Sequence, residues 1–335
     1  GNISLGKISF NHKDALGHGS KGTVVYKGRF EKSQDCAIKC MVSQCMNFAD
    51  REVDFLRSLQ HPNLVRYLAT EMDIQFIYIA LELAEFTLSA VIENDRLSDI
   101  YLEKEEICRQ AASGLKYLHD LNVVHRDIKP ENILISFARR PNNQRTVMIS
   151  DFGLSKELTN IDTCHSSSVM RYFDGTQGWM APELIEAKMK STDLAPSKSA
   201  DIFSLGCVFY YIIFDGKHPF GEKKEARQDN ILSKQSSIDD FMIMKSNGDC
   251  FCGISKELVV MGNDLVRAMI ESAPKKRPPI GAILKYPMFW CKRDRLNFLA
   301  EVSDRMDKDK DIASRVEQGR TRVIGYDWKQ YMSQS

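Results

Sequence analysis

The chain lacks an excess of charge of one sign. Its 335 residues include 46 lysines and arginines against 45 aspartates and glutamates, which gives a formal net charge of +1 at pH 7. A nucleic acid or an anionic membrane surface is attracted by a strongly basic protein, so this balance offers no overall field for either partner. We therefore expect no nucleic-acid binding from this chain.

Long hydrophobic runs are also missing. The longest apolar run, residues 207–214, is far shorter than the ~18 residues that a membrane span needs. Residues 1–10 lack the apolar core of a signal peptide. We expect any membrane attachment to depend on segments outside this sequence.

The cysteines do not form a pattern typical of disulfides or zinc. Nine of them make an odd number, and some lie inside apolar runs such as residues 202–214. The spacing of Cys36, Cys40 and Cys45 does not give two matched Cys-x-x-Cys knuckles. We interpret the cysteines as reduced thiols, which favours a cytoplasmic or nuclear protein.

Hydrophobic periodicity changes along the chain. Residues 23–26, 35–41 and 76–81 are short β-branched segments typical of strands, and residues 47–59 show the spacing of a helix. Beyond residue 83 the patterns become helical, with an apolar stripe along residues 102–118 and an almost wholly apolar helix over residues 200–214.

These patterns predict an α+β fold with two lobes. We expect a small β-rich lobe over residues 1–83 and a larger helical lobe over residues 84–290, joined by a linker at about residues 82–85. A strongly charged composition begins after Trp290, so residues 291–335 are expected to form a separate segment. Two polar stretches, residues 137–145 and 222–249, are interpreted as solvated connections.

The first chemical signal is a G-x-G-x-x-G-x-V string at residues 17–24. Glycines let backbone amides approach phosphate without obstruction by Cβ. In dinucleotide-binding folds a helix follows such glycines, whereas residues 23–26 favour a strand, as in a flap over a nucleotide. An ordinary glycine hairpin is the alternative. The residues assigned here to nucleotide binding are Gly17, Gly19, Gly22 and Val24.

Residues 36–39, Cys-Ala-Ile-Lys, resemble the V-A-I-K strand of protein kinases, in which the lysine holds the α- and β-phosphates of ATP. Lys39 then requires a carboxylate, and Glu52 in the predicted helix is a suitable partner. A solvated surface pair is the alternative. We assign Ala37, Lys39 and Glu52 to the nucleotide site.

The strongest string is His-Arg-Asp-Ile-Lys-Pro-Glu-Asn at residues 125–132, which matches the kinase catalytic loop H-R-D-x-x-x-x-N. Asp127 is predicted to orient the attacking hydroxyl or accept its proton, and Asn132 to bind Mg²⁺ through its amide oxygen. Lys129 resembles the lysine of the serine/threonine class that neutralises the transferring phosphoryl group. His125 is interpreted as a structural residue.

Two further strings complete the order expected of a protein kinase. Asp151 opens the Asp-Phe-Gly string that follows a predicted strand, and is expected to bind Mg²⁺; residues 181–183 are Ala-Pro-Glu. The resemblance also implies two structural roles, in which Asp201 braces the catalytic loop and Arg277 pairs with Glu183. With its phosphate-transfer residues present, the chain is predicted to be an active kinase that uses ATP and Mg²⁺.

The segment between residues 151 and 183 carries hydroxyls that could be phosphorylated. Arg126 is placed, as in the family, to receive a phosphate from this segment. We expect switching by phosphorylation, with a flexible serine-rich loop as the alternative. The candidate acceptors are Thr163, Ser166, Ser167 and Ser168.

The chain resembles, over nearly its whole length, the inositol-requiring kinase/endoribonuclease family, the endoplasmic-reticulum stress sensors of the unfolded protein response. The resemblance implies a homodimer that phosphorylates its own activation loop on the cytosolic face of the endoplasmic-reticulum membrane. It also implies that Leu81 lines the adenine pocket. The strings that carry it are residues 6–10, 48–53, 149–154, 175–179, 201–204, 207–211 and 218–221.

The sequence also bears on two other classes of function. A nucleotide-gated dimerisation scaffold would need Lys39 and Asp151 but could lose Asp127 with little effect. An RNA-processing enzyme is disfavoured, because residues 291–335 resemble only the start of the family's ribonuclease domain and His218 is the last histidine. We expect no ribonuclease activity from this chain.

Overall fold

The computed structural model describes residues 2–18, 22–42, 58–139, 143–151, 156–157, 175–192, 194, 197–238 and 255–323. The chain divides into two compact units, residues 1–284 and residues 285–335. The predicted three-part division of the chain stays a prediction. In the described part of the chain, every helix is too short or too polar to cross a membrane.

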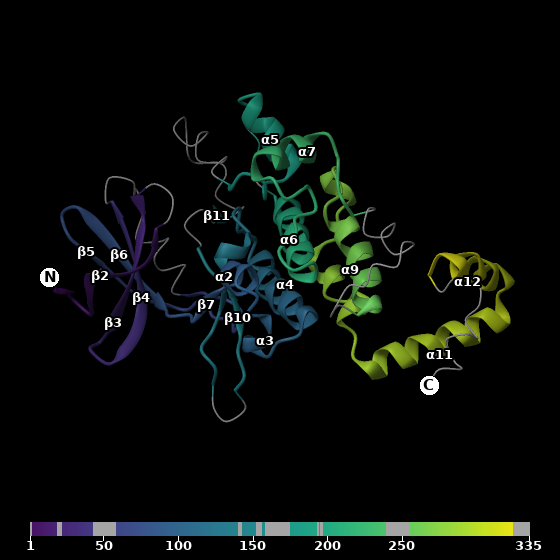
Figure 1. The fold of residues 1–335 in the computed structure, drawn as a ribbon, viewed down its shortest axis with the longest axis horizontal. Coiled ribbons are helices and arrows are strands. Elements are labelled where there is room, and N and C mark those ends of the chain that lie inside the picture. Colours follow the sequence, from purple (N-terminus) through teal and green to yellow (C-terminus); the bar gives the residue numbers. More distant parts are fainter. Residues whose placement is uncertain are drawn as a thin grey trace. The chain divides into compact units, whose positions relative to one another are not determined.

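The first unit begins with a six-stranded antiparallel sheet, drawn in purple to blue in Figure 1, in the order β1-β2-β3-β4-β6-β5. Alternate residues of its central strand β4, namely Cys36, Ile38 and Cys40, are buried with Phe10 and Tyr78 in one core. Its strands are β1 (Asn2–Leu5), β2 (Ile8–His18), β3 (Val24–Phe30), β4 (Gln34–Val42), β5 (Tyr67–Met72) and β6 (Phe76–Glu82).

The rest of this unit is mainly helical. On helix α4, Ile107, Ala111, Leu115 and Leu118 are completely buried, as the apolar stripe in the sequence predicts. The helices are α2 (Leu88–Glu93), α3 (Leu97–Ile100), α4 (Lys104–Asp120), α5 (Pro182–Met189), α6 (Lys198–Ile213), α7 (Arg227–Leu232), α9 (Lys256–Met269) and α10 (Ile280–Ile283).

Helix α6 is the centre of this helical part. All of its residues from Ala200 to Ile213 are buried, which explains why its sequence is apolar all round. It packs against α4 and α9. Gly206 permits this close approach, because a Cβ there would lie 2.8 Å from atoms of Met269 and Ile270 on the α9 side.

Short strands carry the loops of the candidate site. Strands β10, β9 and β7 form one small sheet, and β11 pairs with β8 in another. β6 ends at Glu82 and β7 begins at Phe86, which is where the sequence predicts the linker. The strands are β7 (Phe86–Thr87), β8 (Val123–Val124), β9 (Ile133–Ile135), β10 (Val147–Ile149) and β11 (Lys156–Glu157).

Two sequence interpretations need correction. Residues 222–249 are not simply a solvated connection, because they contain helix α7, in which Arg227 and Ile231 are buried. Residues 137–145 end in Arg145, which is only 9% exposed. The predicted helix over residues 47–59 lies almost wholly outside the described residues.

The second unit contains two charged helices, α11 (Lys292–Lys308) and α12 (Lys310–Val323), which contact each other. Within this unit the ring of Phe298 meets Trp290 edge-on, with 5.1 Å between the ring centres. Leu296, Phe298 and Leu299 nevertheless remain substantially exposed.

Candidate active site

The catalytic loop, residues 125–132, lies between strands β8 and β9 and is held in place by a residue of helix α6. The buried carboxylate of Asp201 accepts hydrogen bonds from the backbone N–H groups of His125 and Arg126, both at 2.8 Å. The ring of His119 lies 2.9 Å from the same carboxylate. The prediction that Asp201 braces this loop is confirmed.

Asp127 is enclosed by donors on both of its carboxylate oxygens. Oδ1 accepts hydrogen bonds from the backbone N–H and the hydroxyl of Thr176, at 3.0 and 2.7 Å. Oδ2 accepts one from the Asn132 amide at 3.0 Å and lies 2.8 Å from Nζ of Lys129. A side chain with so many partners has a fixed orientation, which is what a group that directs an attacking hydroxyl requires.

Thr176 is a residue of this cluster to which sequence reasoning gave no role. Its hydroxyl donates to Asp127 and accepts a hydrogen bond from Nζ of Lys129 at 2.6 Å. The hydroxyl oxygen of Thr176 therefore contacts both predicted catalytic side chains, Asp127 and Lys129. The available signal was its place in the 175–179 string, shortly before the Ala-Pro-Glu motif.

Asn132 and Asp151, the predicted Mg²⁺ ligands, are brought together by the backbone. Ser150 donates two hydrogen bonds to the carbonyl of Asn132, from its N–H at 2.9 Å and its hydroxyl at 3.0 Å. The Asn132 amide nitrogen donates to Asp127, so its oxygen is the atom suited to a cation. The Asp151 side chain, the next residue after Ser150, is 38% exposed.

This set of donors fits Mg²⁺. Carboxylate and amide oxygens are the protein ligands that Mg²⁺ prefers, and it commonly takes only one or two of them together with substrate phosphates. Among the residues that the structure describes, no three His, Cys, Asp or Glu side chains gather into an all-protein metal site. The arrangement therefore suits a cation shared with a nucleotide.

His125 connects the catalytic loop to the same backbone. Its side chain is completely buried, and Nε2 lies 2.8 Å from the carbonyl oxygen of Ser150. A ring held in this way between two loops agrees with the structural role expected for it.

Lys39, on β4, forms an ion pair with Asp151 at 2.5 Å. The lysine side chain is 15% exposed, so its charge lies close to the protein interior and next to a predicted metal ligand. Its predicted partner Glu52 lies outside the described residues.

The pairing of β3, β4 and β6 shows which side chains share a face with Lys39. Ala37 lies directly opposite Leu81, and Lys39 directly opposite Val25. Because side chains alternate along a strand, these four share one face of the sheet. Val24 instead lies opposite Cys40, on the face of the buried core. The assignment of Val24 to the nucleotide site stays a prediction, and the register favours Val25 in its place.

The glycine-rich segment leaves open space near its backbone. A Cβ added to Gly17 or Gly22 would meet no atom within 4 Å, so neither glycine is required by packing in the described part of the chain. Gly22 has φ +74°, a conformation that favours glycine. Both observations fit a segment that a phosphate approaches. Gly19 lies outside the described residues, as do Thr163 and Ser166 to Ser168.

Arg277 and Glu183 form a buried bidentate ion pair away from the catalytic cluster. Each of the two guanidinium nitrogens Nη1 and Nη2 lies 2.7 Å from one carboxylate oxygen, and the arginine side chain is completely buried. This pair confirms the structural role predicted for Arg277 and anchors the start of α5.

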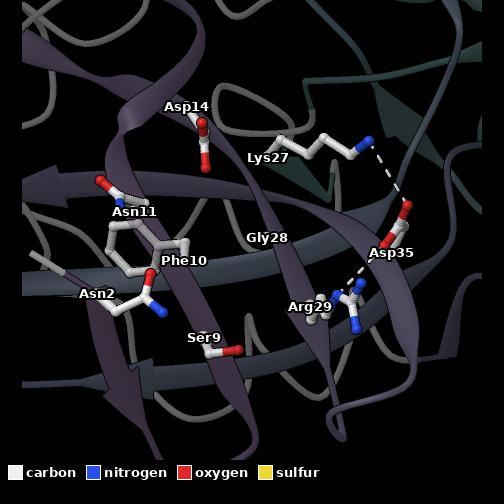
Figure 2. Close-up of a pocket in the computed structure, with 9 residues that line it drawn as sticks. All are labelled: Asn2, Ser9, Phe10, Asn11, Asp14, Lys27, Gly28, Arg29 and Asp35. Carbon is white, nitrogen blue, oxygen red and sulfur yellow. Dashed lines mark ion pairs between the residues drawn. The ribbon is translucent and has the colours of Figure 1, made fainter.

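A pocket of about 260 Å³ lies over β1, β2 and β3 (Figure 2). Asp35 lies at its edge, 3.6 Å from Nζ of Lys27 and 3.8 Å from Nε of Arg29. Its lining residues include none of the predicted site residues. This pocket is therefore distinct from the catalytic cluster.

Comparison with known proteins identifies the class. A family model described as the protein kinase domain matches residues 10–289. The chain belongs to the protein kinase family. The α+β, two-lobed kinase fold predicted from the sequence is confirmed, and so is the predicted enzyme class, an ATP-dependent serine/threonine protein kinase.

Three curated relatives show which group of protein kinases this chain is similar to. It is 40% identical to the Homo sapiens serine/threonine-protein kinase/endoribonuclease IRE2 over 98% of this chain and 34% of the relative. It is 36% identical to the Caenorhabditis elegans serine/threonine-protein kinase/endoribonuclease ire-1, over 97% of this chain and 32% of the relative. It is 34% identical to a Schizosaccharomyces pombe protein named sensor for unfolded proteins in the ER ire1, over 98% of this chain and 31% of the relative.

These relatives confirm the resemblance to the inositol-requiring kinase/endoribonucleases. The kinase spans about a third of the length of the curated relatives it matches.

Proposed function

We propose that this kinase transfers the γ-phosphoryl group of ATP to serine and threonine hydroxyls of proteins, and that one substrate is a second copy of itself. The observation that carries the proposal is the cluster of Asp127, Lys129 and Thr176, in which a fixed carboxylate and a cation share one hydroxyl. Phosphoryl transfer requires alignment and charge stabilisation more than covalent help from the protein, and this cluster supplies both.

Each residue has a distinct task in the proposed reaction. Asp127 orients the acceptor hydroxyl and receives its proton, while Lys129 neutralises charge on the transferring group. Lys39 holds the α- and β-phosphates. Asn132 and Asp151 would hold Mg²⁺, which would offset the negative charge of the ATP phosphates.

We further propose that this activity belongs to signalling in the unfolded protein response, at the cytosolic face of the endoplasmic reticulum. The support is the similarity to the Schizosaccharomyces pombe relative named as a sensor for unfolded proteins in the ER. Homodimerisation and phosphorylation at Thr163, Ser166, Ser167 or Ser168 form part of this proposal, because Arg126 next to Asp127 could receive such a phosphate.

The test is incubation of the purified chain with labelled ATP and Mg²⁺, beside an Asp127→Asn variant, with mapping of the labelled residues. We expect label on the hydroxyls between residues 151 and 183 in the unmodified chain only. Equal binding of ATP by both proteins, with no label in either, would refute the enzyme and favour a nucleotide-gated scaffold.

A further inference from the structure

The hairpin that joins β9 to β10 has no role in the proposed reaction, yet its arms are well paired. Beyond the ends of the strands, the N–H of Ser136 donates to the carbonyl of Thr146 at 2.9 Å, and the N–H of Thr146 donates to the Ser136 hydroxyl at 2.9 Å. Further out, Arg139 and Gln144 exchange two backbone hydrogen bonds, at 2.9 and 3.3 Å. The two arms are thus hydrogen-bonded just beyond the strands, and again at an isolated bridge between Arg139 and Gln144.

This hairpin lies beside the linker between the two lobes. The linker starts at Glu82, whose N–H donates to the carbonyl of Arg66 at 2.8 Å on the side of the six-stranded sheet. It ends at Glu85, whose N–H donates to the carbonyl of Ile135 on β9 at 2.9 Å. One end of the linker is therefore attached to each lobe.

Two arginines on opposite arms of the hairpin reach both ends of the linker. Nη2 of Arg139 lies 3.2 Å from Oε1 of Glu82. Nη1 of Arg145 pairs with the carboxylate of Glu85 and also donates to the carbonyl of Ser136 at 3.1 Å. The Arg139–Glu82 pair crosses from the helical lobe to the last residue of the sheet.

The two pairs differ in burial. Arg145 is 9% exposed, and its guanidinium lies over the ring of Phe86, 5.5 Å from the ring centre, while Arg96 lies 4.5 Å from the same centre. The Arg139 side chain is 67% exposed. A buried ion pair resists separation more than an exposed one, which solvent screens. The ion pair of Arg145 therefore holds the linker more strongly than the ion pair of Arg139.

We propose that Arg139 and Arg145 are positioning residues of the nucleotide site, which brace the interlobe linker and thereby set the affinity of the kinase for ATP. Leu81 lies directly opposite Ala37 and immediately precedes Glu82, so a shift of the linker moves the face of the sheet that the nucleotide would contact. This inference rests on the proposed function, because it assumes that ATP binds between the lobes.

The physical reason is that adenine must fit between surfaces from both lobes. A linker held at both ends keeps these surfaces at one separation, so less freedom is lost when the nucleotide binds. Removing a brace leaves the bound geometry accessible but less populated, which lowers affinity without changing the chemical step. The expected signature is a raised KM for ATP with a nearly constant kcat.

The test measures Mg²⁺–ATP binding by titration calorimetry and steady-state kinetics with a peptide substrate. The variants are Arg145→Met, Arg139→Glu, and Arg139→Glu combined with Glu82→Arg, which restores the exposed pair with its charges reversed. Lys116→Met is the control, because it removes a solvent-exposed ion pair within α4, with Asp120. Thermal unfolding establishes that each variant is folded.

We expect the Kd for ATP to rise about tenfold in Arg145→Met and about threefold in Arg139→Glu, as for loss of a buried and an exposed ion pair. The reversed pair should recover most of the affinity, and Lys116→Met should change nothing. KM for the peptide should remain constant throughout. If Arg145→Met does not fold, Arg139→Glu and the reversed pair decide the question.

Two negative results have different meanings. An unchanged Kd in Arg139→Glu and in folded Arg145→Met, or no recovery in the reversed pair, would refute the brace while the kinase still binds ATP. Failure of the unmodified chain to bind ATP would refute the proposed function and, with it, this inference.

Discussion

Replacement of Thr176 by valine tests the alignment of the catalytic cluster. Valine has nearly the same shape but cannot donate to Asp127 or accept from Lys129, so contacts of 2.7 and 2.6 Å are lost. A hydrogen bond to a charged group contributes ~1.5–3 kcal/mol. The backbone N–H of Thr176 continues to hold Asp127, so we expect the loss of one such contribution from the transition state, not of two.

That loss corresponds to a decrease in kcat of about 10- to 150-fold, because ~1.4 kcal/mol is tenfold in rate. KM for ATP should remain within about twofold, since Thr176 contacts neither Lys39 nor Asp151 among its described hydrogen bonds. The assay is the initial rate of peptide phosphorylation at varied ATP, with Thr176→Ser as the control that keeps the hydroxyl. A folded Thr176→Val enzyme with kcat within threefold of the unmodified one would refute this reasoning.

Four further predictions concern other parts of the chain. Lys39→Met, which leaves Asp151 without its ion pair, should lower kcat/KM for ATP at least 100-fold in the same assay, and a smaller effect would contradict its role at the phosphates. Arg277→Met leaves the Glu183 carboxylate without its bidentate partner and should destabilise the fold by ~3–5 kcal/mol, seen as a Tm about 4–7 °C lower in a thermal melt. Burial, and then the nearby Arg227, lower the pKa of His218 to about 3, so between pH ~6.5 and pH 3 the histidine takes up a proton only in the unfolded chain. Denaturant titrations should therefore show the free energy of unfolding falling by ~1.4 kcal/mol per pH unit between these two values, and His218→Phe should remove that slope. The purified chain should not cleave a fluorophore-labelled RNA, and Mg²⁺-independent cleavage would overturn that expectation.

Short motifs predicted most of the catalytic cluster, because kinase chemistry fixes residue types at fixed spacings. Asp127, Asn132 and Asp151 were assigned in this way, and the structure brings them together through Ser150. Thr176 received no role because it lies 49 residues from Asp127, and nothing local in a sequence reports a contact over that distance.

The register of strand pairing also could not be predicted from the sequence. Motif counting selects Val24, but the face on which a side chain lies depends on the pairing with β4, and a shift of one residue reverses it. The pairing places Val25 opposite Lys39.

The interpretation of residues 137–145 and 222–249 as solvated connections needs correction for a different reason. Arginines and asparagines in residues 137–145 look like solvated surface, since sequence composition cannot show that Arg145 is buried and paired with the carboxylate of Glu85. In residues 222–249, helix α7 has too few buried positions to leave a periodic pattern.

The buried carboxylate of Asp201 has a consequence for how activity is lost. It holds the amides of His125 and Arg126 from helix α6, whose residues Ala200 to Ile213 are all buried, so we expect these N–H groups to exchange with solvent only when α6 itself separates. We expect hydrogen–deuterium exchange at both amides to require global unfolding, unlike exchange at frayed loops. A partly denatured population would then consist of fully competent and fully inactive molecules, with no species of intermediate turnover.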